Sequence, residues 1–280
     1  MEKQDKKMKI LFILGLSHSG STFLDMLLSH YTGAIGLGEL HAVADEKTTN
    51  TEHTFDICSC GEKMKACSFW KKLDGFHASG SDEDRYKAYY QKFIEMASLE
   101  GKDIIIDSSK KTSTLNEVLK LQDAGIAEVK VIYIVKDLRS YLQSMHSYYK
   151  RQSRRWRPYW HTAWRWNKKL TRMEKNLLDK KIPHIQISYE KLCFETSAVL
   201  GEIFEFSGLD NSQFSFENGM CSHVAYGNRT KKSFQGVQDI RYSSEWMYNF
   251  WLNVCALLAF PLYKKSQDRF ATKIMYREDE

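Results

Sequence analysis

The chain has 280 residues, of which 42% are hydrophobic, and it contains six cysteines and three prolines. These values predict one globular domain over residues 1–280 and exclude a collagen-like, low-complexity or disulfide-stapled protein. The formal net charge of +6 is uneven, because residues 150–181 hold twelve lysines and arginines but only two acidic residues. This basic segment on an otherwise slightly acidic chain indicates a polyanionic ligand or surface.

Two apolar segments are candidates for targeting or membrane insertion, and both are too short. The run that follows the basic N-terminus has about seven residues and no cleavage site, so we interpret it as a strand and not as a signal peptide. Segment 253–263 contains Pro261 and is expected to be a core helix. With no export signal and few cysteines, we expect a cytoplasmic protein without a transmembrane anchor.

Strands and helices are predicted to alternate along the chain. The predicted strands are residues 10–14, 103–107, 129–135 and 182–188. The predicted helices begin after Gly20, cover 113–124 and 196–207, and begin near Ser140. Alternation of this kind forms βαβ units, so we predict an α/β fold with a three-layer, P-loop-like parallel sheet and helices on both faces. Ligands bind such sheets at the carboxyl ends of the strands.

Three further segments are expected to decorate this domain. An insertion at 41–101 contains a helix at 82–98 with Ser81 as its N-cap. The basic segment 150–181 interleaves arginine with tryptophan and is expected to form a lid and an acceptor wall. Trp160, Trp164 and Lys168 share one helical face there. A single-stranded nucleic acid, an anionic membrane surface or a half-buried structural helix are the alternatives for this segment. A tryptophan-rich helix is predicted near 244–259.

The stretch GLSHSGST, residues 15–22, follows the first strand and fits the phosphate-loop frame GxxxxGK[ST] except at Ser21, where the lysine is missing. A glycine-rich turn and a helix N-terminus hold an anion without that lysine. The loss argues against a triphosphate and favours a shorter anion, such as a phosphate that bears one more group. A plain glycine turn that caps a helix is the alternative.

Cationic residues follow the next two strands. Lys110 and Lys111 follow strand 103–107, and Lys136 follows strand 129–135. Lys136 and Ser144 can flank a phosphate if the strand ends at residue 135 and Ser144 lies on the next helix. A solvated loop and a surface serine are the alternative.

These motifs together resemble the sulfotransferases that use 3'-phosphoadenosine 5'-phosphosulfate (PAPS), with features of the bacterial and tyrosylprotein types. The resemblance covers most of the chain and includes ISYEKL at 187–192 and GNRTK at 227–231. Two positions depart from the family pattern. The family usually has Arg or Lys at the position of His18 and Arg at the position of Lys136. The cofactor-binding residues that the resemblance implies are Ser17, His18, Ser19, Gly20, Ser21, Thr22, Lys136, Ser144, Arg229 and Lys231.

The resemblance also implies a reaction. It is an in-line transfer of a sulfuryl group to an acceptor hydroxyl on a glycan, lipid, peptide or small molecule, with no metal and no nucleic acid required. The base would be Glu39 in GLGELH, with His41 as its rival. Lys110, and His18 when protonated, would stabilise charge in the transition state. A solvated loop carboxylate is the alternative for Glu39.

Cys58, Cys60 and Cys67 in CSCGEKMKACSFW are spaced unlike a paired CxxC metal motif. A fourth metal ligand would have to be His53 or His77. We therefore favour a structural turn with a redox-labile cysteine pair over a zinc site.

Two other functions remain open from the sequence. A P-loop nucleotide-dependent kinase is supported by residues 104–107, which match a Walker B strand. A non-catalytic polyanion-binding protein would use segment 150–181 on a degenerate loop scaffold. The missing lysine at Ser21 weighs against the kinase.

Overall fold

The computed structural model describes residues 7–45, 57–152, 157–228 and 239–259, together with positions 236, 261 and 273–275. The chain divides into two compact units. Unit 1 comprises Met1–Leu14, Ser21–Val131 and Ser207–Asp239, and unit 2 comprises Gly15–Gly20, Ile132–Phe206 and Ile240–Glu280. The single domain expected over residues 1–280 stays a prediction.

The strands form a sheet with the order β2-β3-β1-β4-β5-β6. Strand β3 pairs in parallel with β1 and with β2, whereas β6 pairs antiparallel with β5. All of β1 and β4 except their first residues is buried, as the apolar runs of a parallel sheet require. This parallel sheet with flanking helices confirms the predicted α/β class. The strand bounds are Lys9–Gly15 (β1), Ala34–Gly38 (β2), Ile104–Lys110 (β3), Glu128–Val135 (β4), His184–Ser188 (β5) and Lys273–Met275 (β6).

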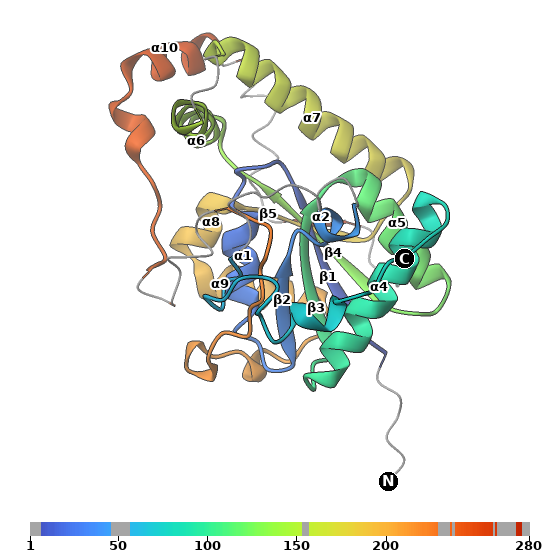
Figure 1. The fold of residues 1–280 in the computed structure, drawn as a ribbon. Helices are drawn as coiled ribbons and strands as arrows, with labels where there is room; N and C mark the ends of the chain where they lie inside the picture. The colour runs from blue at the N-terminus through green and yellow to red at the C-terminus, as the bar shows by residue number, and fades with distance from the viewer. Residues whose placement is uncertain are drawn as a thin grey trace. The chain divides into compact units, whose positions relative to one another are not determined.

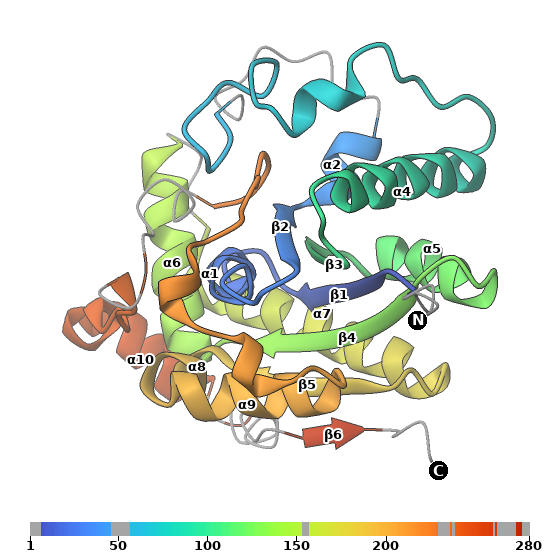
Figure 2. The same cartoon turned by 90° about the horizontal axis from the view of Figure 1, so that it is seen from below.

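In unit 1, α1 packs against β2 and β3, while α4 and α5 pack against each other and against β3 (Figures 1 and 2). Ser81 caps α4 as predicted, because its hydroxyl accepts the Asp84 N–H and the Asp84 carboxylate accepts the Ser81 N–H. The helices of unit 1 are α1 (Ser21–Leu28), α2 (Leu40–Ala44), α4 (Asp82–Leu99) and α5 (Thr112–Asp123), with 3-10 turns η1 (Trp70–Leu73), η2 (Asn211–Gln213) and η3 (Phe216–Asn218).

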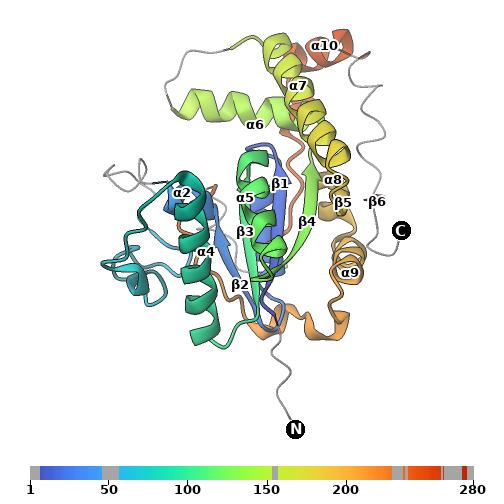
Figure 3. The same ribbon diagram turned by 90° about the vertical axis from the view of Figure 1, so that its right-hand side faces the viewer.

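In unit 2, α8 and α9 lie along β5, and α10 contacts both α6 and α7 (Figures 2 and 3). On α7, Trp166 is buried while Trp160 and Trp164 are exposed, and the Lys168 Nζ lies 4.8 Å from the centroid of a Trp164 ring. The predicted shared face of α7 is therefore present. The helices are α6 (Leu138–Arg151), α7 (Tyr159–Asp179), α8 (Tyr189–Phe194), α9 (Thr196–Phe206), the 3-10 turn η6 (Glu245–Tyr248) and α10 (Phe250–Leu258).

The core helix expected in segment 253–263 is wrong for the part of it that the structure describes. In α10 only Leu252 is buried, while Trp251 and Leu258 are 72% and 77% exposed. The prediction failed because a helix with apolar residues on all of its faces does not reveal which face packs against other elements. Among the helices that the structure describes, none combines the length and apolar character needed to cross a bilayer.

Candidate functional site

At Gly15 and Gly20, the two glycines of the phosphate-loop frame, the structure leaves no space for a side chain. Gly20 has φ +95°, and a Cβ there would lie 2.3 Å from the Tyr189 ring. A Cβ at Gly15 would lie 2.7 Å from the Ile134 carbonyl oxygen. Real Cβ atoms do not approach other atoms so closely, and φ near +95° is unfavourable for other residues. The local backbone therefore requires the two glycines that the phosphate-loop frame predicts.

The end of this loop carries unsatisfied hydrogen-bond donors. Ser19 is 2% exposed, and its hydroxyl has no hydrogen-bond partner among the described residues. Helix α1 begins two residues later at Ser21, and the first N–H groups of a helix have no intrahelical acceptor. Ser17, at the start of the turn, is exposed. These donors fit an anion such as a phosphate.

Thr22 links the start of α1 to the late GNRTK stretch. The Thr22 hydroxyl accepts a hydrogen bond from the backbone N–H of Asn228 at 3.1 Å. This contact brings together two segments that are 206 residues apart. Arg229 and Lys231, the predicted cofactor-binding residues that follow Asn228, lie outside the described residues.

His18 and Ser144 are in contact within unit 2. The His18 Nδ1 lies 3.3 Å from the Ser144 hydroxyl, and the His18 ring centroid lies 5.0 Å from that of Tyr148. The backbone of His18 has φ +71°, a left-handed value that is rare outside glycine. The loop therefore holds a strained residue against the serine that was predicted to bind a second phosphate.

Lys136 lies immediately after β4, which ends at Val135, and Ser144 lies in α6. These are the positions that the sequence prediction requires for the two residues to flank one phosphate. Both residues line a cavity of about 170 Å³ whose other walls are mainly polar. The Lys136 Nζ sits 4.1 Å from the centroid of the Tyr189 ring, and burial lowers the pKa of this lysine. A buried ammonium is stabilised by an anion, so this cavity suits a phosphate group.

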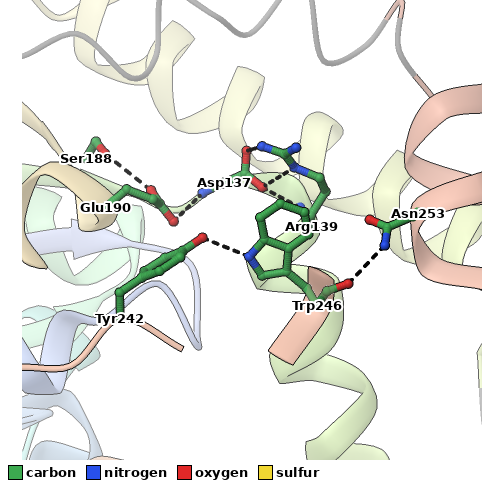
Figure 4. A network of polar contacts seen from close by, with 7 residues as sticks. All are labelled: Asp137, Arg139, Ser188, Glu190, Tyr242, Trp246 and Asn253. Atoms are coloured by element: carbon green, nitrogen blue, oxygen red, sulfur yellow. Dashed lines mark hydrogen bonds and ion pairs between the residues drawn. The ribbon is translucent and has the colours of Figure 1, made fainter. Parts of the chain in front are cut away.

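A polar network anchors the start of α6 (Figure 4). Asp137 is the N-cap of the helix and accepts hydrogen bonds from the backbone and side chain of Arg139. Glu190 accepts the Asp137 backbone N–H at 3.2 Å and the Ser188 hydroxyl at 3.2 Å (Figure 4). Burial raises the pKa of Glu190 to about 6. The ISYEKL motif therefore supports both Gly20, through the Tyr189 ring, and the helix of Ser144.

Sequence reasoning assigned no roles to Tyr189 and Glu190. Both residues belong to the ISYEKL motif, but their contacts are made with residues more than 50 positions away in the chain. Only the fold brings them to the loop.

Glu39 and Lys110 meet within unit 1. The Lys110 Nζ and the Glu39 Oε1 are 2.5 Å apart, and the two side chains are 10% and 23% exposed respectively. Lys110 ends β3 with φ +66°, and Glu39 follows β2 with its N–H donated to the Tyr226 carbonyl at 3.1 Å. Left-handed non-glycine residues concentrate at functional sites. A carboxylate and an ammonium group are thus held together at the ends of two neighbouring strands.

His41, the rival base, is more deeply placed. His41 is only 6% exposed. Burial, followed by the nearby positive charge of Lys111, lowers the pKa of its imidazole to about 4. The His41 backbone N–H donates to the Ser109 hydroxyl at 3.1 Å. Of the two candidates, Glu39 is the more exposed to solvent.

Asp107, the Walker B candidate of the kinase hypothesis, is fully buried and fully engaged. Its two carboxylate oxygens accept hydrogen bonds from Tyr90 and from the hydroxyl and backbone N–H of Ser109. Burial raises its pKa to about 6. A carboxylate so enclosed is unsuited to a magnesium ion that keeps several waters.

A second and larger cavity of unit 2 opens beside the loop and measures about 1110 Å³. It is lined by Ser17 and His18 from the loop and by tyrosines and cations from α6, α7 and the segment between them. The described lining includes no carboxylate. The lining residues besides the loop are Tyr141, Met145, Tyr148, Tyr149, Arg157, Pro158, His161, Arg165 and Lys169.

The three cysteines of the insertion cluster with a histidine that the sequence did not suggest. Their sulfur atoms and a ring nitrogen of His223 all lie within 4.8 Å of one another. The sequence predicted His53 or His77 as the fourth ligand. His77 is exposed and lies outside the cluster, so that prediction is wrong for His77. His53 lies outside the described residues. His223 is 156 positions from Cys67, so spacing gave no signal for it.

The parallel sheet, its flanking helices and the glycine-rich turn after β1 define an α/β protein. The family model described as "Sulfotransferase family" matches residues 11–213, which is more than half of the chain. The chain belongs to this family. No curated protein matches the sequence.

Solved structures similar to this chain include three sulfotransferases or sulfotransferase domains. The domain from the Synechococcus PCC 7002 olefin synthase is 17% identical, with 92% of this chain and 98% of that chain covered and a TM-score of 0.49. The domain from the curacin biosynthetic pathway is 17% identical, with 81% and 80% covered and a TM-score of 0.49. The sulfotransferase from Alicyclobacillus acidocaldarius is 13% identical, with 90% and 95% covered and a TM-score of 0.42.

Proposed function

We propose that this sulfotransferase takes its sulfuryl group from PAPS and transfers it to an acceptor hydroxyl. The observation that carries the proposal is the contact between His18 of the lysine-free loop and Ser144, which lines the same small cavity as Lys136. One anion site at the loop and a second, cationic one beside it match a nucleotide with a 5'-phosphosulfate and a 3'-phosphate. A nucleoside triphosphate has no 3'-phosphate that could occupy the second site.

The proposed donor contacts follow from the loop. Ser19 and the N–H groups of Ser21 and Thr22 would hold the 5'-phosphosulfate, because these donors lack intramolecular acceptors at a helix start. Lys136 and Ser144 would bind the 3'-phosphate. Ser17, Gly20, Arg229 and Lys231 complete the proposed donor site.

The proposed chemistry is an in-line displacement at sulfur. The acceptor oxygen forms a bond to sulfur as the bond between sulfur and the bridging phosphate oxygen breaks, and adenosine 3',5'-bisphosphate leaves. Glu39 takes the proton of the acceptor hydroxyl, and Lys110 donates to the oxygens on which charge develops. His18 adds a hydrogen bond to the bridging oxygen. These cationic and polar groups supply the charge stabilisation, so the proposed step asks for no metal ion.

We further propose that the acceptor carries a negative charge close to its hydroxyl. The large cavity beside His18 contains Arg157, Arg165 and Lys169, and its described lining has no acidic residue. Burial lowers the pKa of Lys169, and the like charges of Arg165 and Arg157 lower it further. Repulsion of this kind is relieved by an anionic ligand. The tyrosines of the same cavity would pack against an apolar or ring portion of the acceptor.

The test has a binding part and a transfer part. Adenosine 3',5'-bisphosphate is expected to raise the melting temperature, whereas adenosine 5'-monophosphate, which lacks the 3'-phosphate, is expected to raise it much less. Labelled PAPS is then incubated with hydroxyl acceptors paired as neutral and anionic forms. Stabilisation by ATP with magnesium but not by the bisphosphate would support the kinase instead. Tight heparin binding without transfer to any acceptor would support the polyanion-binding protein.

A further inference from the structure

A compact group of three cysteines and one histidine lies in unit 1, apart from the residues proposed for catalysis. Cys58 and Cys67 are buried, Cys60 is exposed, and His223 is partly buried. All four ligand atoms lie within 4.8 Å of one another. We refer to these four residues as the Cys3His cluster.

The separations between the ligand atoms match those around a tetrahedral metal ion. The Cys67 sulfur is 3.7 Å from the Cys58 sulfur and 3.7 Å from the Cys60 sulfur. The His223 Nδ1 is 3.2 Å from the Cys67 sulfur and 3.7 Å from the Cys58 sulfur. Tetrahedral zinc with usual bond lengths requires sulfur to sulfur separations of about 3.8 Å and sulfur to nitrogen separations of about 3.5 Å.

The backbone around the cluster is arranged to present the sulfur atoms. The Gly61 N–H donates to the Cys58 carbonyl at 3.0 Å in a tight turn, and Gly61 has φ +93°. The Cys58 N–H donates to the Glu62 carbonyl and the Cys67 N–H donates to the Lys63 carbonyl, each at 2.8 Å. These backbone hydrogen bonds fix the two buried cysteines of the cluster at either end of the turn.

The histidine is oriented by its neighbours. Its ring stacks on Phe69, with centroids 5.2 Å apart and an interplanar angle of 15°. The Trp70 indole N–H donates to the His223 carbonyl at 2.7 Å, and the His223 N–H donates to the Gly36 carbonyl at 2.7 Å. A metal-binding histidine is typically fixed by surrounding contacts in this way.

We propose that Cys58, Cys60, Cys67 and His223 bind one structural zinc ion. Three soft thiolates and one imidazole form a ligand set typical of zinc, and four protein ligands leave no open position for a substrate. A disulfide accounts less well for the geometry. Cys67 is equally distant from the two other sulfur atoms, and His223 approaches the same point.

The ion joins the insertion to the segment that borders the proposed base. Ser222 forms a parallel bridge with Gly36, and three residues after His223 the Tyr226 carbonyl accepts the Glu39 N–H at 3.1 Å. The metal therefore fixes segment 221–226 along β2 and positions Glu39 through it. On this basis His223 and the cysteines are positioning residues and take no part in the transfer itself.

The first experiment measures metal in the full-length protein, purified under reducing conditions without chelator. Elemental analysis is expected to find about one zinc per chain, and X-ray absorption to find three sulfur and one nitrogen neighbours at bond lengths of about 2.3 Å and 2.0 Å. A tetrahedral cobalt spectrum is expected after exchange with Co²⁺. Absence of zinc both as purified and after incubation with Zn²⁺ would overturn the proposal. A disulfide within the cluster in freshly isolated protein, detected by intact mass after thiol blocking, would also overturn it.

The second experiment uses Cys60→Ser, because Cys60 is exposed and its substitution leaves core packing intact. Zinc content after dialysis against a weak chelator is expected to fall at least about tenfold relative to wild type. His77→Gln and Cys255→Ser, which change a histidine and a cysteine outside the cluster, are expected to retain zinc. A strong chelator should lower the melting temperature of the wild type and both controls, but not of Cys60→Ser. Zinc that is equally retained by Cys60→Ser would contradict the assignment. These readouts do not depend on sulfuryl transfer, so they test the metal site separately from the proposed function.

Discussion

The Glu39 carboxylate and the Lys110 ammonium form an ion pair of 2.5 Å at the ends of two adjacent strands, with the side chains only 23% and 10% exposed. Glu39 is fixed by the Tyr226 carbonyl, and Lys110 is held in a left-handed conformation. Each partner therefore orients the other before a substrate arrives. A base and a cation that are positioned in advance lower the reorganisation needed during the reaction.

Glu39→Gln should abolish most of the transfer activity while the fold is retained. Glutamine keeps the size of the side chain but does not accept a proton, so we expect kcat to fall about 10²- to 10⁴-fold. Turnover of labelled PAPS measures the effect. The matched control is Glu83→Gln, which breaks a 2.7 Å ion pair with Lys120 between exposed side chains. Equal rates for Glu39→Gln and the control would exclude Glu39 as the base.

Lys110→Met should reduce transfer about 10²- to 10³-fold, because a charge that stabilises the transition state is lost. The double variant with Glu39→Gln should lose less than the product of the two single effects, since the proposed mechanism has the paired residues act as one unit. Single-turnover rates for the four proteins of this cycle give the coupling. Fully multiplicative losses would show that the ion pair has no joint role.

Gly20→Ala should destabilise the protein more than an ordinary substitution of a left-handed glycine. The new methyl would lie 2.3 Å from the Tyr189 ring. We expect the left-handed backbone to cost about 1–2 kcal/mol and the overpacking about 1–3 kcal/mol. Gly125→Ala is the control, because Gly125 has φ +73° but no atom within 4 Å of the position that a new methyl would take. Urea unfolding measures the free energy of unfolding of both variants. Equal losses of stability would show that the Tyr189 ring moves aside without an energetic penalty.

Lys136→Met should weaken binding of adenosine 3',5'-bisphosphate about 10- to 100-fold, the equivalent of one charge-assisted hydrogen bond. Binding of adenosine 5'-monophosphate should change little, because it has no 3'-phosphate. Calorimetric titration of both nucleotides gives the comparison. A similar loss for both ligands would mean that Lys136 acts on the fold or on the 5' group.

Stability should depend on pH through Asp25. Burial, with a smaller contribution from the neighbouring Asp107 carboxylate, raises the pKa of this carboxyl from 3.8 to about 8. Between these two values the folded state holds a proton that the unfolded state has released. The stabilisation is therefore complete below about pH 4 and decreases by up to about 1.4 kcal/mol per pH unit as the pH rises toward 8.

Asp25→Asn should remove this contribution, since asparagine has no charge to bury and its oxygen still accepts the Gly38 N–H. Urea unfolding at several pH values between about 5 and 8 should show a shallower decline for the variant than for the wild type. Parallel curves for the two proteins would mean that Asp25 is ionised in the folded state.

Much of the fold was predictable from local patterns. The apolar runs identified β1, β3, β4 and β5 to within a few residues, because strands buried on both faces are continuously apolar. Ser81 was identified as a cap because the interaction spans only three residues. Strand β2 was not predicted, since its two glycines interrupt the apolar pattern in AIGLG.

The site was less predictable than the fold. Lys136 and Ser144, which are eight positions apart, line the same cavity. Their proximity was predictable because the end of a strand and the start of the next helix are close in the chain and have a regular geometry. His223 joins the cysteines, and Tyr189 covers Gly20, through contacts between segments that are more than 150 positions apart. Contacts of that range depend on tertiary packing and leave no periodic signal in a single sequence.

His18 and Lys110, both proposed to stabilise charge, are two of the three non-glycine residues with left-handed backbones in the described chain. Glycine at either position would relieve about 1 kcal/mol of backbone strain and remove the polar side chain at the same time. Selection for heat resistance alone would therefore favour substitutions that, under the proposed mechanism, lower the transfer rate. Under the proposed mechanism, thermal tolerance and turnover would make opposite demands on the residue at each of these two positions.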